Sequence, residues 1–223
     1  MKSISSAGTP VFVWDSATRL FHWGVAALVV AAYATWRLNW MDAHARVGVS
    51  VLALVFFRIL WGIFGSDPTR FSHIVASPRA AVQHLAHLLR REPDDQAGHN
   101  PAGGWMVLTL LVLLLGETVT GIYIANDVAD EGPFTEIIPA PIANAITALH
   151  WIIWDTLLVA VGLHLLAIGL YAAVKGQNLL LPMITGWKML PASVPQPRMV
   201  GETRAVIFLV CGALAAALLA KVL

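Results

Sequence analysis

Four histidines are the residues of this sequence whose type and placement best fit metal-ligand chemistry. They lie within or beside long apolar stretches, at His22, His44, His150 and His164. An ionisable side chain is costly inside a lipid bilayer, so an intramembrane histidine is a candidate for a functional role. Neutral imidazole is a common ligand of iron and other transition metals. We therefore take these four histidines as the candidate cofactor-binding and metal-ligating residues.

The spacing of His150 and His164 predicts two ligands on one face of a single helix. They are 14 residues apart, a rotation of about 1400°, which is close to four full turns of an α-helix. The same segment rises about 21 Å. One histidine is therefore expected near each side of the membrane.

Five apolar segments are long enough to carry these residues across a hydrocarbon core about 30 Å thick. They cover residues 17–36, 44–64, 103–125, 142–174 and 205–223. The composition agrees, because 58% of the residues are hydrophobic and only 12% are charged, far from the average of soluble domains. We predict an all-α membrane protein, with a four-helix transmembrane bundle in residues 1–190 and a tail, 191–223, that carries a fifth C-terminal transmembrane helix.

Charges in the connections predict the orientation, because Lys and Arg are retained on the cytoplasmic side. Basic residues follow the second and fourth spans: Arg70, Arg79, Arg90, Arg91, Lys175, Lys188, Arg198 and Arg204. The connection after the third span is acidic, with Asp127, Asp130, Glu131 and Glu136. Only Arg37 and Arg46, in the first connection, oppose this pattern. The N-terminus is therefore expected in the cytoplasm and the C-terminus on the outer side, with the first span retained rather than cleaved as a signal peptide.

Depth in the membrane then pairs the histidines. His22 and His164 are expected at the cytoplasmic level, and His44 and His150 at the outer level. Two imidazoles at each level suit two six-coordinate haems b, which transfer electrons without an open coordination site. The haems must be held non-covalently, since Cys211 is the only cysteine and no C-x-x-C-H motif is present. The alternative is four unrelated core histidines.

Two arginines are candidate partners of haem propionates. Arg58 lies 14 residues beyond His44, hence on nearly the same helix face and about 21 Å deeper. Arg19 precedes His22 by about one turn. Either side chain could instead reach lipid phosphate at the membrane surface.

Other polar residues give weaker signals. Glu117 and Asp155, in the third and fourth spans, are candidates for a proton relay, or for hydrogen bonding with Thr118 or Thr120. An interfacial helix is predicted over residues 77–91, with Ser77 as its N-cap. The remaining histidines are expected to be solvated: His73, His84, His87 and His99. The i, i+3 spacing of His84 and His87 is a weak signal for a metal site.

Several motifs resemble those of bacterial cytochrome b561. They are VWDSATRLFHW around His22, AHARVG around His44 with FRILWGIFG after it, GHNPAGGWMVL at the third span, and the NLLLPMITGWK that ends the His150/His164 helix. The b-type cytochrome subunits of nickel-iron hydrogenases share this pattern. The resemblance covers roughly residues 10–188 and implies a diheme four-helix bundle in the bacterial cytoplasmic membrane. The implied ligands coincide with the four histidines.

The leading functional prediction is electron transfer between the membrane quinone pool and a periplasmic redox partner such as a cytochrome c. One alternative is the quinone-reactive anchor subunit of a larger oxidoreductase, such as a nickel-iron hydrogenase with its periplasmic dehydrogenase subunit. A superoxide-to-quinone oxidoreductase and, from another class, a metal-ion transporter are further alternatives. The net charge of +1 and the lack of a basic motif argue against nucleic-acid binding. The sequence identifies no catalytic residue. Whether the protein is also an enzyme, as an electron-transfer oxidoreductase of the membrane, is therefore left open.

Overall fold

The computed structural model describes residues 8–88, 90, 95–124 and 139–221, and within this part of the chain long helices dominate. The long helices are α1 (Ser16–Arg37), α2 (Met41–Phe64), α5 (Pro101–Gly121), α6 (Ala140–Leu170) and α8 (Glu202–Lys221). The last turn of α6 continues as the π-helix η3 (Tyr171–Lys175). Within the described residues, five helices are long and apolar enough to cross a membrane. The predicted all-α membrane fold is confirmed, with helix ends within a few residues of the predicted segments.

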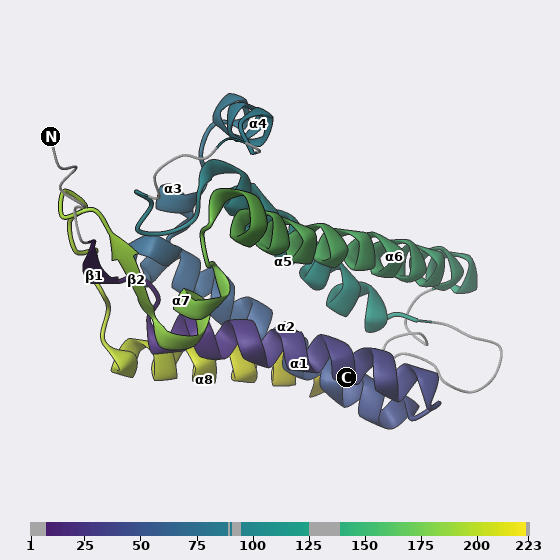
Figure 1. Ribbon diagram of the computed structural model, residues 1–223. Coiled ribbons are helices and arrows are strands. Elements are labelled where there is room, and N and C mark those ends of the chain that lie inside the picture. Colours follow the sequence, from purple (N-terminus) through teal and green to yellow (C-terminus); the bar gives the residue numbers. More distant parts are fainter. Residues whose placement is uncertain (1–7, 89, 91–94, 125–138, 222–223) are drawn as a thin grey trace, which may run out of the picture.

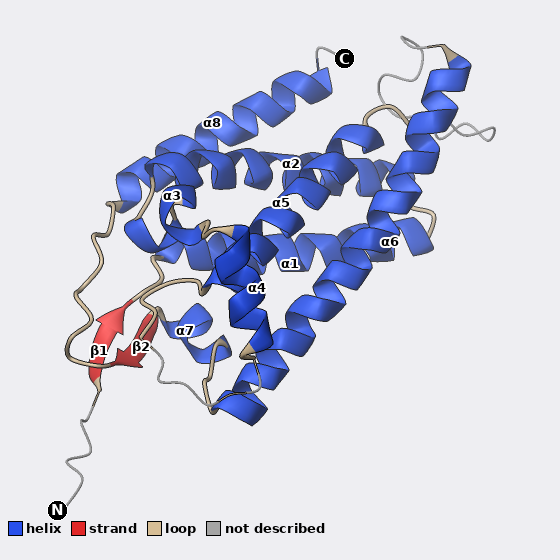
Figure 2. Ribbon diagram, turned by 90° about the horizontal axis from the view of Figure 1, so that it is seen from above, coloured by secondary structure: helices blue, strands red, loops and turns tan. Residues whose placement is uncertain are grey.

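The long helices form two antiparallel hairpins, with the fifth helix outside them. α1 packs on α2, α5 packs on α6, and α2 joins the two hairpins by packing on α5. Figure 1 shows the α5–α6 pair above the α1–α2 pair, and α8 against the side of α2 in both views (Figures 1 and 2). The fifth helix therefore has no part in the four-helix bundle that carries the histidines.

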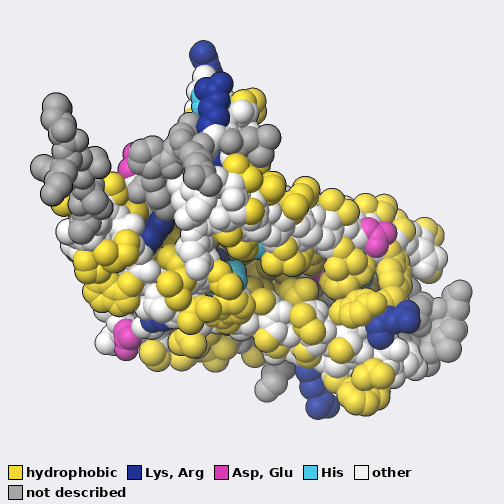
Figure 3. Space-filling view, in the orientation of Figure 1, with side chains coloured by type: hydrophobic (Ala, Val, Ile, Leu, Met, Phe, Trp, Pro, Cys, Tyr) yellow, Lys and Arg dark blue, Asp and Glu magenta, His cyan; other side chains and the backbone are white. Residues whose placement is uncertain are grey.

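Apolar side chains hold this bundle together. The central cluster consists of Val51 and Val55 of α2, Leu111 and Leu114 of α5, and Leu157 of α6. Many other apolar side chains are exposed on the outside of the helices, and Figure 3 shows hydrophobic side chains along the length of the bundle. Such an apolar exterior is what a lipid environment requires.

A small two-stranded sheet covers one end of the bundle, a feature that the sequence analysis did not predict. Strand β1 (Thr9–Phe12) pairs antiparallel with β2 (Trp187–Leu190). Val11, Val13 and Leu190 are almost fully buried there. We call this the sheet end of the bundle, and the end at which α1 meets α2 the far end.

Short helices lie at the sheet end: η1 (Asp67–Thr69), α3 (Phe71–Ile74), α4 (Pro78–Ala86) and α7 (Leu180–Thr185). α4 is the predicted interfacial helix, and it is shorter than expected. The Ser77 hydroxyl accepts from the Ala80 N–H at 3.2 Å, as predicted for an N-cap. α4 lies across the bundle axis, seen end-on in Figure 1.

Local sequence explains the helix boundaries near the histidines. The Asp15 carboxylate caps α1 by accepting from the Thr18 N–H at 2.7 Å. Asn100 caps α5 in the same way through the Gly103 N–H, and Pro101 occupies the first helical position. At the sheet end, Gly186 has φ 88°, a left-handed conformation that glycine adopts without steric cost. It turns the chain from α7 into β2.

Candidate haem-binding site

The structure brings His22 of α1 and His164 of α6 together at the sheet end. Their ring centroids are 6.3 Å apart and their planes are inclined by 53°. A metal ion held about 2 Å from one nitrogen of each of two imidazoles separates the ring centres by roughly 6 Å. The spacing of this sheet-end pair therefore suits a metal bound between the rings.

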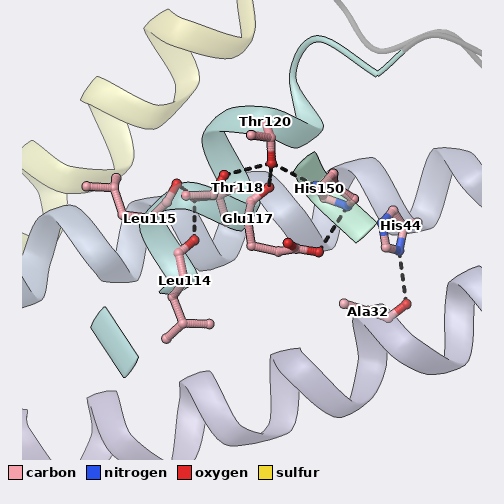
Figure 4. A network of polar contacts seen from close by, with 9 residues as sticks. Ala32, His44, Leu114, Leu115, Glu117, Thr118, Thr120 and His150 are labelled. Carbon is pink, nitrogen blue, oxygen red and sulfur yellow. Dashed lines mark hydrogen bonds and ion pairs between the residues drawn. The ribbon is translucent and has the colours of Figure 1, made fainter. Parts of the chain in front are cut away.

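His44 of α2 and His150 of α6 are neighbours at the far end, as Figure 4 shows. His44 Nδ1 lies 2.9 Å from the carbonyl oxygen of Ala32. A carbonyl only accepts hydrogen bonds, so we assign the ring proton to Nδ1. Nε2 of His44 is then left with its lone pair, the form in which imidazole binds a metal.

His150 is oriented by a threonine hydroxyl. Thr120 Oγ1 lies 2.9 Å from His150 Nδ1, and it also lies 2.7 Å from the carbonyl oxygen of Gly116. Because the single hydroxyl proton is donated to the carbonyl, the hydroxyl accepts from the ring, and His150 carries its proton on Nδ1. With this assignment Nε2 is the unprotonated nitrogen in both histidines of the far-end pair, so the 3.0 Å contact between His150 Nε2 and Glu117 Oε1 requires the proton of a neutral Glu117 carboxyl group.

Glu117 contacts the same ring from α5. Its Oε1 lies 3.0 Å from His150 Nε2, and within the described part of the chain its buried Oε2 has no hydrogen-bond partner. The sequence analysis considered hydrogen bonds from Glu117 to threonines, but both hydroxyls, those of Thr118 and Thr120, bond to main-chain carbonyls instead. Asp155 is exposed on α6. The predicted Glu117–Asp155 relay therefore has no continuous path through these contacts.

Of the two candidate arginines, Arg58 is the more deeply buried, with 3% of its surface exposed. Its Nη2 donates to the Thr69 carbonyl at 3.1 Å, and its guanidinium lies 5.1 Å from the ring centre of Phe71. Arg19 is half-buried and donates to the Ile184 carbonyl at 2.6 Å. Neither guanidinium therefore has the fully exposed position expected of an arginine that simply extends toward lipid phosphate.

A further histidine at the sheet end was missed from the sequence. His99 was expected to be solvated, but the structure shows it half-buried, with its ring 4.7 Å from that of Trp14. Burial, followed by the nearby Arg58 and His164, lowers the pKa of His99 to about 3, although a hydrogen bond to the Pro68 carbonyl opposes this shift. Its position directly before the N-cap Asn100 gave no signal of this burial, because the ring packs on Trp14, a residue distant in the sequence.

Among the described residues, no group of three or more His, Cys, Asp or Glu side chains could hold a metal ion, so the site considered for His84 and His87 gains no support. His84 Nε2 is hydrogen-bonded to the hydroxyl of Tyr171, which also accepts from Asn100 Nδ2 at 2.9 Å. His73 is exposed, and its Nδ1 is hydrogen-bonded to the Asp67 carbonyl. His84 thus links α4 to the end of α6.

These residues fit a haem at both ends of the bundle. The sheet-end pair has the required ring spacing, and the far-end pair has the required tautomers. Buried Arg58 has a free donor atom, Nη1, among the described contacts. One rearrangement is needed, since an iron on His150 Nε2 and the Glu117 contact exclude each other. Rotation of the Glu117 side chain removes this conflict.

Comparison with known proteins agrees with this site. The model of one family, described as prokaryotic cytochrome b561, matches residues 13–186. The match includes all four histidines and both arginines and ends before α8. No curated protein matches the chain. Because the match spans most of the sequence, the chain belongs to the prokaryotic cytochrome b561 family, whose members are haem b-binding membrane proteins of electron transfer.

Proposed function

We propose that this protein carries electrons across the bacterial cytoplasmic membrane through two haems b. One is assigned to His22 and His164, the other to His44 and His150. The observation that carries this proposal is that α6 presents one histidine at each end of the bundle, each facing a histidine from another helix (Figure 4 for the far end).

Bound haem supplies one-electron chemistry at its iron. The four histidines would hold the two haems, two at each end of the bundle. The hydrogen bonds from Nδ1 of His44 and His150 hold these rings in place and would make Nε2 a stronger iron ligand, as outer hydrogen bonds do at metal sites. Iron held by two histidines would favour electron transfer over the binding of a further ligand.

Aromatic side chains of α1 and α6 contact each other toward the far end of the bundle. Tyr33 of α1 stacks on Trp154 of α6 with ring centroids 5.9 Å apart, and Trp36 meets Trp151 edge-on at 5.2 Å. These ring contacts join α1 to α6, the two helices that carry His22, His150 and His164.

The electron-transfer partners we propose are a membrane quinone or quinol and a periplasmic redox protein such as a cytochrome c. With the N-terminus in the cytoplasm, the sheet-end pair lies on the cytoplasmic side and the far-end pair on the periplasmic side. The basic segments around α4 and after α6 support this orientation. The acidic segment 127–136, which could attract a basic cytochrome c, lies outside the described residues.

A second candidate is a membrane-anchor subunit of a larger oxidoreductase. The position of α8 favours it, because this helix packs on α2 away from the histidines and exposes apolar side chains such as Val206, Val210 and Leu214. A partner helix could pack there without disturbing the bundle. The superoxide and metal-transport alternatives gain no comparable support from the geometry.

The test is spectroscopic and functional. The purified protein should contain two haems per chain and show b-type bands on reduction. His22→Ala or His164→Ala should remove one haem, and His44→Ala or His150→Ala the other. In liposomes that contain quinol, reduction of external cytochrome c should require both haems. Protein without haem, or with one haem that all four variants remove, would refute the assignment.

A further inference from the structure

Arg58 is a buried cation with an incomplete set of partners. Its exposed fraction is 3%, and its Nη2 donates to the Thr69 carbonyl. Among the contacts of the described chain, Nη1 is buried without a partner. A buried guanidinium that lacks partners is strongly unfavourable, so its position implies that an acceptor is bound beside it.

The nearest acid does not provide this acceptor. Asp15 acts on Arg58 through its charge, but among the described residues no hydrogen bond or ion pair joins the two side chains. Oδ1 accepts from the Thr18 N–H at 2.7 Å, and Oδ2 accepts from the indole N–H of Trp61 at 3.2 Å. The carboxylate is thus held by the N-terminus of α1 and by α2, and it leaves Nη1 of Arg58 unsatisfied.

His99 adds a second unsatisfied atom at the same place. Its Nδ1 is also buried without a hydrogen-bond partner in the described ranges. His99 lies close enough to Arg58, His22 and His164 to interact with all three electrostatically. A loop residue and a helix residue thus each place a buried polar atom without a partner in the neighbourhood of the sheet-end pair.

We infer that Arg58 and His99 together bind a propionate of the haem held by His22 and His164. This inference rests on the proposed function. Nη1–H of Arg58 donates to one carboxyl oxygen. The second bond joins the other oxygen to Nδ1 of His99 and contains one proton, carried by the carboxyl group or by the ring. A propionate fits because it is the ionisable group of haem and therefore the part of the molecule that needs polar partners.

The assignment also fixes the direction of the haem. Its propionate edge would face the loop before α5 and the Arg58 side of α2, whereas Arg19 donates to the Ile184 carbonyl on the α7 side. His99 would thus bind the haem in addition to the four histidine ligands and the two candidate arginines. Its ring is held in place by Trp14, at 4.7 Å.

The test is a redox titration of the purified full-length protein, followed by the visible spectrum. His99→Phe keeps the aromatic contact with Trp14 but removes the nitrogen, and His99→Asn keeps a polar group near the position of Nδ1. Less compensation of the propionate charge favours ferric iron, so we expect His99→Phe to retain two haems and make reduction of one of them about tenfold less favourable. For one electron this is a potential lower by about 59 mV.

His99→Asn should restore most of this shift, and Arg58→Met should lower the same potential. The control is His73→Gln, since the His73 ring is exposed and is hydrogen-bonded to the Asp67 carbonyl; this substitution should change neither potential. Unchanged potentials in His99→Phe, or an equal shift in His99→Asn, would overturn the inference. If His99→Phe does not fold, an unchanged potential in folded Arg58→Met overturns it. Wild-type protein without haem would instead refute the proposed function itself.

Discussion

Replacing Thr120 by Val should weaken the haem at the far end and leave the other haem in place. Valine has nearly the same shape as threonine but lacks the hydroxyl that accepts from His150 Nδ1 at 2.9 Å. The ring then loses the contact that fixes its tautomer, and its buried N–H is left unsatisfied, at a cost of about 1–3 kcal/mol.

The expected size of the effect is a 10–100-fold loss of affinity at that site, as is typical when an outer hydrogen bond to a metal ligand is removed. The potential of the remaining far-end haem should rise, because a less basic imidazole stabilises ferric iron less. Haem-free protein titrated with haem, followed by its absorbance, measures the affinity, and a redox titration measures the potential.

Thr118 provides a matched control on the same helix. Its hydroxyl bonds to the Leu114 and Leu115 carbonyls, as that of Thr120 bonds to Gly116 and Glu117, but no contact between Thr118 and a histidine is present among the described residues. Thr118→Val should bind both haems normally. Equal effects of the two substitutions, or loss of the haem at the opposite end in Thr120→Val, would refute the tautomer assignment.

Three further predictions follow from other parts of the structure. Glu117→Gln should bind the far-end haem at least as tightly as the wild type, because the carboxylate contacts the ligand nitrogen of His150 at 3.0 Å; a weaker haem in a binding titration would show that Glu117 supports the site. Gly104→Ala should destabilise the fold by several kcal/mol, since the added Cβ would lie 1.8 Å from the Ile74 carbonyl oxygen. Gly48→Ala should destabilise it little, because nothing lies within 4 Å of a Cβ at that position. Thermal unfolding in detergent compares the two variants, and similar unfolding midpoints would contradict this packing. A reporter fused to the C-terminus should be active only if it is a periplasmic type, such as a phosphatase; activity of a cytoplasmic reporter there would reverse the orientation.

The sequence alone was sufficient for the membrane fold and for the levels of the histidines. Apolar runs of membrane-spanning length predict helices directly, because a single spanning segment satisfies its backbone hydrogen bonds only as a helix. The confirmed spans place His22 and His164 toward one end of the bundle and His44 and His150 toward the other. Depth follows from the rise per residue, which is the same in every α-helix.

Contacts between distant segments required the tertiary structure. The pairing of residues 9–12 with 187–190 joins short strands that carry no membrane signal. The approach of Glu117 to His150 and of His99 to Arg58 depends on how far each helix is rotated about its axis, and packing against neighbouring helices decides that rotation. Composition and spacing fix where along the membrane normal a side chain lies, whereas only packing fixes which neighbour it faces. For this reason the sequence located the four candidate ligands, and the structure added the threonine, the glutamate and the fifth histidine beside them.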